Sequence, residues 1–491
     1  MTTTDTLTCP APGASADVAT TVTTAGPLLP VVGSDTLVPL VDGRSVAYAN
    51  LDVAASAPAL RSVADRVAEV LPLYASVHRG AGYLSQVSTA LYEASRQAVG
   101  AFVGAREDDV TIVVRNTTDA TNLLAGCVPA AASGAPGRVL VLDTEHHANL
   151  LPWRGEGAAG GGAVRATTLE AAPTVAGTLD ALRAELAAAS AAGDPYALVA
   201  VTGASNVTGE SLPVADVVAL AHDAGARVFL DGAQLVPHRR FSLAATGVDY
   251  VAFSGHKTYA PYGAGALVGR RDWLDTGTPY LAGGGAVRNV TTSDVVWHPA
   301  PARHEAGSPN VLGAVALAAA CGALGEVDDA ALREHERVLR DRLVAGLEAI
   351  PGVRVVRVWQ DAVDPVGVVT FSVDDHDPGL VAAYLSAEHG IGVRDGRFCA
   401  HPLLRRLGHA AGAVRASVGV GTSGEEVERL IGALETFVTE GPAATYAVVD
   451  GLWVVEDDPR PLPEASGLSG LVATAAAGFI AESAGCGPAL D

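Results

Sequence analysis

Lys257 is the only lysine in the 491-residue chain, although Lys and Arg together number 32. Arginine can replace lysine wherever only a positive charge is needed, but its guanidinium stays protonated and cannot attack a carbonyl carbon. A lysine kept in such an arginine-rich background is therefore a candidate covalent nucleophile. The alternative interpretation is that one lysine survived by chance.

Acidic and amide side chains follow two apolar runs. Asp231 and Gln234 come after the run 227–230, and Asn206 follows the run 198–202. A carboxylate at the end of an apolar strand is costly to bury unless it is paired. A protonated pyridine nitrogen is such a partner, and the ring that carries it can act as an electron sink. Asn206 and Gln234 could then reach the phenolic oxygen of that ring.

Hydroxyl side chains stand where a phosphate could bind. Thr117 and Thr118 follow the run 110–114 and precede a helical pattern. The free amides and the dipole of a helix N-terminus suit a phosphate, although threonine there is also an ordinary helix cap. Ser254 and His256, close before Lys257, can bind the same phosphate.

A histidine pair follows the run 138–142. His146 could stack on an aromatic cofactor and exchange protons with its substrate. A histidine pair in a loop can equally lie on the surface or bind a metal, but no matching carboxylate pattern accompanies it and no metal site is predicted. Taken together, these groups fit pyridoxal phosphate (PLP), held by Lys257 as a Schiff base.

The elements that would position these side chains are short β-branched runs alternating with Ala/Leu-rich helical patterns. Continuous apolar runs are typical of parallel strands covered on both faces. The alternation predicts an α/β domain with a largely parallel sheet, which binds ligands at the carboxyl ends of its strands. The expected strands are 110–114, 138–142, 198–202, 227–230, 250–253 and 265–268, and the clearest helices are 179–192 and 214–224.

A second unit follows the long helical stretch 312–348, where the patterns 353–359, 366–373, 380–388 and 427–438 predict a smaller α+β domain. We expect a flexible tail over residues 1–33 and a large cofactor-binding domain over 34–325, whose first segment packs on the small domain. The small domain spans 326–442. An extension of unassigned role, 443–491, contains an aromatic and acidic segment (446–458) and a helix candidate (468–482).

Composition excludes several classes of protein. The hydrophobic share of 49% and the charged share of 18% indicate a globular chain, and the net charge of −22 argues against a nucleic-acid partner. The five cysteines form no CxxC pair, so neither a disulfide framework nor a zinc site is indicated. The N-terminus lacks the basic region of a signal peptide, and no apolar run reaches transmembrane length without Gly, Pro or charge. We expect a cytoplasmic protein without a membrane partner.

The sequence resembles the class V aminotransferase family of fold-type I PLP enzymes, and most closely its cysteine desulfurase and selenocysteine lyase branch. The resemblance runs from about Tyr48 to about Phe437. The motifs that carry it are LDVAAS (51–56), VHRG (77–80), EHHAN (145–149) with PW (152–153), DGAQ (231–234), FSGHK (253–257), GGG (283–285), EAGSPN (305–310), RDGRFC (394–399) and RAS (415–417).

The resemblance implies a fold and a role for each matching residue. The expected fold is a large domain with a mostly parallel seven-stranded sheet plus the smaller C-terminal domain. Lys257 would carry the cofactor, Asp231 would pair its ring nitrogen and His146 would stack on the ring. The phosphate would bind to Thr117, Thr118, Ser254 and His256, and to Ser308 of the second subunit of a homodimer. Arg415 would clamp the substrate carboxylate, with Ala54 and Asn206 beside it.

Cys399 distinguishes between the reactions of this family. In the desulfurases a loop cysteine takes the sulfur of L-cysteine as a persulfide and leaves L-alanine. Cys399 matches that position, but Arg397 and Phe398 replace the two histidines usual before it. Arg397 could favour the thiolate, whereas the alternative interpretation is a small apolar side chain in a substrate loop. Gly82, where a histidine is usual, and Asn116, where a glycine is usual, also depart from the pattern on the expected substrate side.

The leading hypothesis is therefore a PLP-dependent cysteine desulfurase that uses Lys257, His146 and Cys399 and hands its sulfur to an acceptor. A second hypothesis is a class V aminotransferase, epimerase or C–S lyase acting on another amino acid, with Cys399 incidental. A third, a non-catalytic scaffold, is disfavoured by the complete set of Lys257, Asp231 and Arg415.

Overall fold

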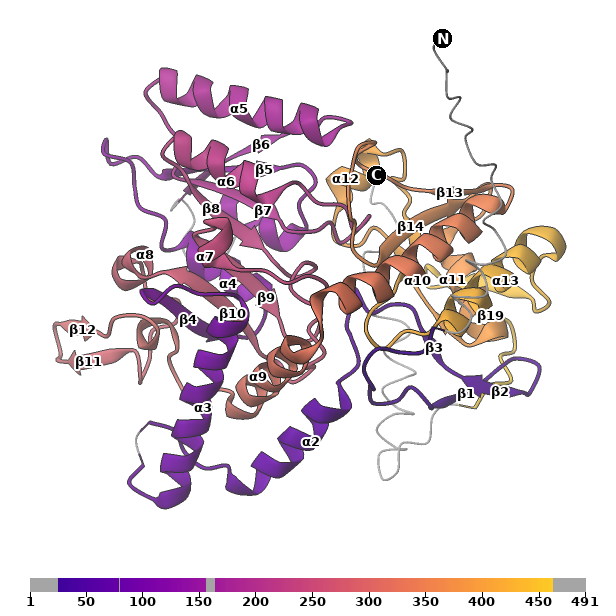
Figure 1. Ribbon diagram of the computed structural model, residues 1–491, viewed down its shortest axis with the longest axis horizontal. Helices are drawn as coiled ribbons and strands as arrows, with labels where there is room; N and C mark the ends of the chain where they lie inside the picture. Colours follow the sequence, from indigo (N-terminus) through magenta and orange to yellow (C-terminus); the bar gives the residue numbers. More distant parts are fainter. Residues whose placement is uncertain (1–24, 79, 156–163, 462–491) are drawn as a thin grey trace, which may run out of the picture.

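The computed structural model describes residues 25–78, 80–155 and 164–461. The helix candidate 468–482 lies outside these residues. A large domain lies on one side of the molecule and a smaller one, orange and yellow, on the other, with a long helix running between them (Figure 1).

The large domain is built on a seven-stranded sheet in the order β4-β10-β9-β8-β7-β5-β6. Six strands point the same way, and β10 alone runs antiparallel to both of its neighbours. The expected run 265–268 is thus a strand, but it is the exception to the parallel arrangement. The strands are β4 (Asp109–Val114), β5 (Gly137–Leu142), β6 (Val164–Leu169), β7 (Leu198–Thr202), β8 (Arg227–Asp231), β9 (Tyr250–Ser254) and β10 (Gly265–Arg270).

Both faces of this sheet are buried. Along β7, Leu198 and Ala200 belong to one apolar cluster, whereas Val199 and Val201 belong to the cluster on the other face. Since successive side chains of a strand point to opposite faces, an unbroken apolar run is what such a sheet requires. The helices of this domain are α2 (Arg61–Val70), α3 (Tyr83–Phe102), α4 (Thr117–Ala125), α5 (Val175–Ala191), α6 (Val214–Asp223), α7 (Leu243–Thr246) and α8 (Arg271–Thr276).

Smaller elements complete the large domain. A two-stranded ribbon, β11 with β12, projects from it (Figure 1). The remaining elements are β11 (Val287–Val290), β12 (Val295–Trp297) and the 3-10 turns η1 (Leu71–Leu73), η2 (His147–Asn149), η3 (Pro152–Arg154) and η4 (Ala302–His304).

The long helical stretch 312–348 is two helices, which corrects the sequence interpretation. α9 (Val311–Glu326) ends before Val327, and α10 (Asp329–Ala349) starts after Asp328, whose side chain accepts a hydrogen bond from Ala331 N at 3.0 Å. An aspartate in this position caps a new helix. Within the described residues no single helix has both the length and the hydropathy of a membrane span, and α9 and α10 meet that test only as a pair bent by 91°.

The small domain contains a four-stranded antiparallel sheet in the order β13-β14-β17-β16. The N-terminal strand β3 pairs in parallel with β15, which joins the beginning of the chain to this domain. The strands are β1 (Leu37–Pro39), β2 (Ser45–Ala47), β3 (Ala49–Asn50), β13 (Val353–Val355), β14 (Val368–Val373), β15 (Ile391–Gly392), β16 (Arg394–Gly396) and β17 (Ala413–Ser417), and the helices are α11 (Pro378–His389), α12 (His401–Arg406) and α13 (Gly424–Glu440).

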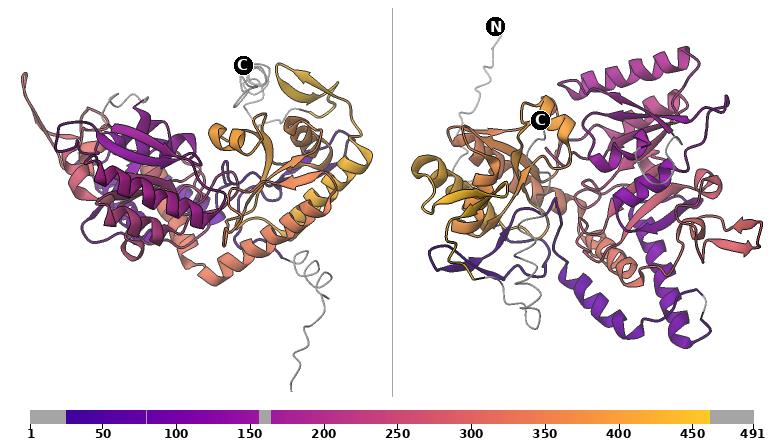
Figure 2. Two further views of the ribbon diagram at one scale, coloured as in Figure 1. Left: turned by 90° about the horizontal axis from the view of Figure 1, so that it is seen from above. Right: turned by 180° about the vertical axis from the view of Figure 1, so that it is seen from behind.

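The structure corrects the prediction for one end of the chain and adds a hairpin that was not predicted at the other. Residues 25–33 were expected in a flexible tail, but Leu28 N and Leu29 N both donate to Val420 O and Val31 is buried. The reason is that Leu28, Leu29 and Val31 pack in an apolar cluster that also contains Tyr259 and Val420. At the other end, the aromatic and acidic segment forms a hairpin of β18 (Tyr446–Val449) and β19 (Leu452–Val455), which stands on the face of the small domain away from α10 (Figure 2).

Candidate active site

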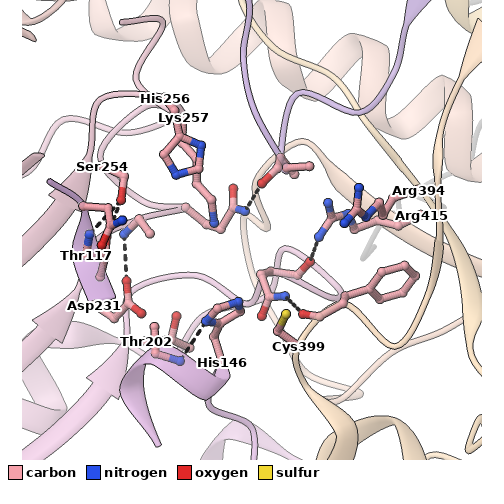
Figure 3. Close-up of a pocket in the computed structure, with 18 of the residues that line it drawn as sticks. Thr117, His146, Thr202, Asp231, Ser254, His256, Lys257, Arg394, Cys399 and Arg415 are labelled. Carbon is pink, nitrogen blue, oxygen red and sulfur yellow. Dashed lines mark hydrogen bonds between the residues drawn. The ribbon is translucent and has the colours of Figure 1, made fainter. Parts of the chain in front are cut away.

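A cavity of about 380 Å³ lies between the carboxyl ends of the large sheet and the small domain. Figure 3 shows Thr117, Ser254 and Asp231 on one side of this cavity, Arg394 and Arg415 on the other, and His146 and Cys399 between them. The described residues that line it are Ala54, Ala55, Asn116, Thr117, Thr118, His146, Ala148, Thr202, Ala204, Asn206, Asp231, Ala233, Gln234, Ser254, His256, Lys257, Arg394, Asp395, Phe398, Cys399, Arg415 and Leu452.

Lys257 and Asp231 come from neighbouring parallel strands. Asp231 ends β8 opposite Ala252 of β9, and Lys257 follows the end of β9 in a turn in which its amide donates to Ser254 O. The pKa of Lys257 is lowered to about 8, mainly by burial; Asp231 opposes this shift, and the positive charge of Arg415 contributes to it. The structure thus favours a lysine that loses its proton far more readily than one in water.

Asp231 is a buried acid with spare bonding capacity. Its Oδ1 accepts a hydrogen bond from Ala233 N at 3.0 Å, and its side chain is almost fully buried. Burial raises its pKa, and Lys257 counteracts that effect. A protonated ring nitrogen at the carboxylate would supply the missing compensation for burial.

The N-terminus of α4 lies at one end of the cavity. Thr117 N donates to Ser254 Oγ at 2.8 Å, so β9 and α4 are joined at this point. Asn116, rather than either threonine, caps the helix by accepting from Asp119 N. Thr118 and His256 also line the cavity here. Hydroxyls and helix amides gathered in this way can bind a phosphate.

Buried hydrogen bonds support the loop that carries His146. Glu145 Oε2 accepts from Asn149 Nδ2 at 2.6 Å, and Asn149 Oδ1 accepts from Trp153 Nε1 at 2.9 Å. Glu145 Oε1 accepts from Thr202 N on the neighbouring strand. The residues of this motif therefore form a hydrogen-bonded chain that fixes the loop bearing His146.

His146 itself is neutral in this setting. Its Nδ1 accepts from Ala148 N at 3.0 Å, which leaves the ring proton on Nε2. Burial and the charge of Lys257 lower the pKa of His146 to about 3. A neutral imidazole can lie flat against an aromatic ring without the cost of a buried charge.

Cys399 enters the cavity on a loop with unusual backbone geometry. Phe398 and Cys399 both have positive φ, 49° and 52°. This left-handed region is uncommon for residues other than glycine. The large domain holds the loop, because Asn206 Nδ2 donates to Phe398 O at 2.7 Å and His147 N donates to Cys399 O at 2.8 Å. Cys399 is only half-buried, and its thiol is accessible from the cavity.

Two other cysteines provide a contrast. Cys127 and Cys321 are buried away from this cavity, and burial raises the pKa of both thiols, that of Cys127 to about 12. Such thiols are poor nucleophiles because little thiolate is present. Among the cysteines that the structure describes, Cys399 is therefore the candidate nucleophile.

Arg415 lies buried on β17 of the small domain. Its Nη1 donates to Asn206 O at 2.8 Å, its Nη2 contacts Asp52 Oδ1 at 3.2 Å, and its Nε has no partner. The guanidinium lies 5.1 Å from the centre of the Phe398 ring. Asp52 and Phe398 thus orient the arginine that would receive a substrate carboxylate.

Twelve of the residues expected at the site line this one cavity, and Ser308 does not. Ser308 is exposed on its own chain, so its predicted role in a second subunit stays a prediction. Ala54 lines the cavity, but its N–H donates to Ser417 Oγ and its C=O accepts from Gln234 Nε2. Gly82 directly precedes α3 and does not line the cavity of its own chain, so its predicted place on the substrate side stays a prediction.

Sequence reasoning missed other residues of the site. Asp52, the partner of Arg415, lies within a motif that was identified without a role. Glu145 likewise opens the histidine motif, and its place directly before His146 was the only signal in the sequence. Leu452 had no signal as a site residue, because it belongs to the extension.

Comparison with known proteins identifies the family. The sequence profile of the family described as aminotransferase class V matches residues 49–430. The chain belongs to the class V aminotransferase family. Its fold-type I architecture, expected from the resemblance, is confirmed. Enzymes of this family depend on PLP, and PLP is the cofactor of this chain.

The similar proteins are named for the same activity. The chain is 36% identical over 398 residues to a cysteine desulfurase of Klebsiella pneumoniae, covering 80% of this chain and 94% of that protein. A probable cysteine desulfurase 2 of Mycobacterium leprae is 36% identical over 397 residues, covering 79% and 91%. A solved cysteine desulfurase of Escherichia coli has a TM-score of 0.69 at 31% identity, covering 79% and 94%. One from Thermococcus onnurineus has a TM-score of 0.70 at 32% identity, covering 80% and 94%.

The residues of the cavity fit PLP. Gln234 Oε1 is buried without a hydrogen-bond partner, and a ligand donor or water in the cavity can satisfy it. Lys257 lies within the same cavity as the acid of Asp231, the imidazole of His146 and the hydroxyls beside α4. This is the set of groups that an aldehyde, a pyridine ring and a phosphate require.

Proposed function

We propose that the protein is a cysteine desulfurase that converts L-cysteine to L-alanine and takes the sulfur on Cys399 as a persulfide. The observation that carries the proposal is that Cys399 opens into the same cavity as Lys257 and Arg415. Three groups therefore surround one cavity: a lysine for amine chemistry, an arginine that can bind a carboxylate, and a thiol that can take sulfur. These are the three groups that L-cysteine requires.

The cofactor residues would act as a set. Lys257 would hold PLP, Asp231 would pair its ring nitrogen, and His146 would lie on its ring. Asn206 and Gln234 would approach its ring oxygen, and Thr117, Thr118, Ser254 and His256 would bind its phosphate. PLP when bound supplies an electrophilic carbon for the substrate amine and an electron sink for the substrate's Cα.

Arg415 would orient the substrate by binding its carboxylate. The unpartnered Nε of this buried guanidinium supports the assignment. Ala54 and Asn206 would line the same side, with Asn206 O already holding Arg415 Nη1 at 2.8 Å. Fixing the carboxylate in this way directs the substrate Cα toward Lys257 and its sulfur toward Cys399.

Lys257 would move the proton. Once the substrate amine has taken its place, Lys257 Nζ is a neutral amine whose pKa of about 8 lets it accept the Cα proton near neutral pH. His146, with its Nε2 proton, lies beside the same region.

Cys399 would take the sulfur. Its thiolate attacks the substrate Sγ, a bond forms between the two sulfurs, and the Cβ–Sγ bond breaks. The electron pair of the broken bond stays with Cβ, which takes up a proton and becomes the methyl group of alanine. The oxidation of sulfur is thus balanced by the reduction at Cβ, and no further oxidant is needed.

The assembly and surroundings belong to the same proposal. The active enzyme is a homodimer in which Ser308 of one subunit completes the phosphate site of the other. It acts in the cytoplasm and passes the persulfide sulfur to an acceptor. Its large domain spans residues 34–325 and its small domain spans residues 326–442.

The test is release of alanine and sulfide from L-cysteine in the presence of a reductant, for the purified protein and for Cys399→Ala. We expect equal amounts of both products from the natural enzyme and neither from the variant. Alanine or pyruvate formation that persists in the variant, or no alanine from the natural enzyme with PLP bound, would favour another class V reaction in which Cys399 is incidental.

A further inference from the structure

The C-terminal hairpin lies outside the part of the chain that the family profile matches. It lies beyond the matched span 49–430 and pairs β18 with β19 over four residue pairs. Asp450 and Gly451, at its tip, both have positive φ (52° and 80°). A two-residue Asp-Gly loop of this kind matches the twist of paired strands. The position of Leu452, directly after the loop, is therefore well defined.

Helix α11 anchors this hairpin. Glu388 accepts hydrogen bonds from Ala443 N, Ala444 N and the Tyr446 hydroxyl, each at 3.0 Å. At the other end of α11, Trp453 packs on Gly379: a Cβ there would lie 2.9 Å from the Trp453 ring. The hairpin is thus fixed at both ends of the helix.

The anchored hairpin lies beside the strand that leads to Cys399. A Cβ at Gly379 would lie 3.6 Å from the Asp395 carboxylate, and Asp395 belongs to β16, which also packs on α11. Of the described residues that line the active-site cavity, Leu452 alone lies outside the matched span. Its partly exposed apolar side chain joins Arg394, Asp395 and Cys399 there.

We propose that Leu452 is a specificity-determining residue that limits, by size, which thiols reach the persulfide on Cys399. The inference rests on the proposed function and deepens it. The acceptor thiolate attacks the outer sulfur of the persulfide, the S–S bond breaks, Cys399 leaves as a thiolate, and the acceptor departs as a persulfide. A fixed side chain at the cavity obstructs a bulky acceptor more than a small one.

The experiment separates sulfur uptake from sulfur transfer. Alanine formed in the first turnover, before any acceptor is added, measures uptake. Acceptor-dependent turnover is then measured with 3-mercaptopropionate and with glutathione, two thiols of equal net charge but different size. The variants are Leu452→Ala and Leu452→Trp. Val448→Ala is the matched control, because Val448 is exposed on the same hairpin and does not line the cavity.

We expect Leu452→Ala to raise the glutathione rate relative to the 3-mercaptopropionate rate by about threefold or more, and Leu452→Trp to lower that ratio. Val448→Ala should leave both this ratio and the first-turnover alanine unchanged. An unchanged ratio in both variants, with normal first-turnover alanine, would overturn this inference alone. No first-turnover alanine from the natural enzyme would overturn the proposed function instead.

Discussion

The two sides of the active-site cavity are built in different ways. On the cofactor side, Asp231 and Ser254 end adjacent strands of one sheet, and Thr117 N is bonded to Ser254 Oγ. On the sulfur side, Cys399 belongs to a loop of the small domain whose backbone is held by Asn206 and His147 of the large domain. The first arrangement is fixed within one domain, whereas the second depends on contact between two.

This difference suggests that the two sides can be changed independently. Hydrogen bonds within a buried sheet edge keep the cofactor groups in place whatever happens to the loop. The loop, by contrast, combines left-handed backbone at Phe398 and Cys399 with a few interdomain bonds. Substitutions on the cofactor side should therefore abolish all chemistry, and those on the sulfur side should alter substrate handling while PLP stays bound.

The largest effect is expected for Lys257→Arg. Arginine keeps the positive charge but cannot form the covalent link or accept the Cα proton. Alanine formation from L-cysteine should fall by at least about 10³-fold. The visible absorbance of the covalently held cofactor should be lost as well. If Lys257→Arg formed alanine at a rate within tenfold of the natural rate, Lys257 would not be the essential amine of the mechanism.

The second-largest effect is expected for Asp231→Asn, which should reduce turnover by about 10²-fold. The amide cannot hold a proton on the ring nitrogen by charge, although it fills the same space. Bound PLP per subunit, measured after release from the protein, should stay near the natural value because the phosphate site is intact. Unchanged turnover at full PLP content would contradict the pairing of Asp231 with the ring nitrogen.

The pH dependence of cofactor attachment tests the environment of Lys257. Only the neutral amine attacks the aldehyde, so the rate at which the apoenzyme binds PLP covalently should rise with pH through a pKa of about 8. An ordinary lysine would give a midpoint near about 10.4. Asp231 favours the charged amine, so Asp231→Asn should move the midpoint lower still. A midpoint above 10, followed by stopped-flow absorbance, would contradict the burial of this amine.

Arg415→Lys tests the sulfur side with the smallest expected effect. A lysine keeps the charge but loses the planar pair of donors, so KM for L-cysteine should rise by about tenfold with PLP content unchanged. An equal rise in the inhibition constant Ki of L-alanine would assign the lost affinity to binding of the carboxylate. A change in PLP content would show that the two sides are coupled after all.

Much of the cofactor side could be predicted from the sequence because its signals are local. Each functional residue follows an apolar run, and six such runs are strands of the large sheet. The strand β6 was missed because it is an edge strand with several partly exposed polar residues, so its pattern is weak. The break at Asp328 was missed because helical patterns on both sides of it hide the cap.

The sulfur side could be predicted only in part. The motif located Cys399, but neither the backbone of its loop nor the bonds from Asn206 and His147 follow from local sequence. The hairpin had a recognisable Asp-Gly turn between apolar residues, yet nothing local indicated that Leu452 reaches the cavity. Contacts between segments far apart in sequence decide these features.

The most direct test of the account is to locate the persulfide. The enzyme is given one equivalent of L-cysteine without reductant, its thiols and persulfides are alkylated, and its peptides are examined by mass spectrometry. We predict one additional sulfur on Cys399, formed with one alanine per active site, and none on the buried Cys127 and Cys321. Alanine formed with no added sulfur on Cys399, or with the sulfur on another cysteine, would contradict the account.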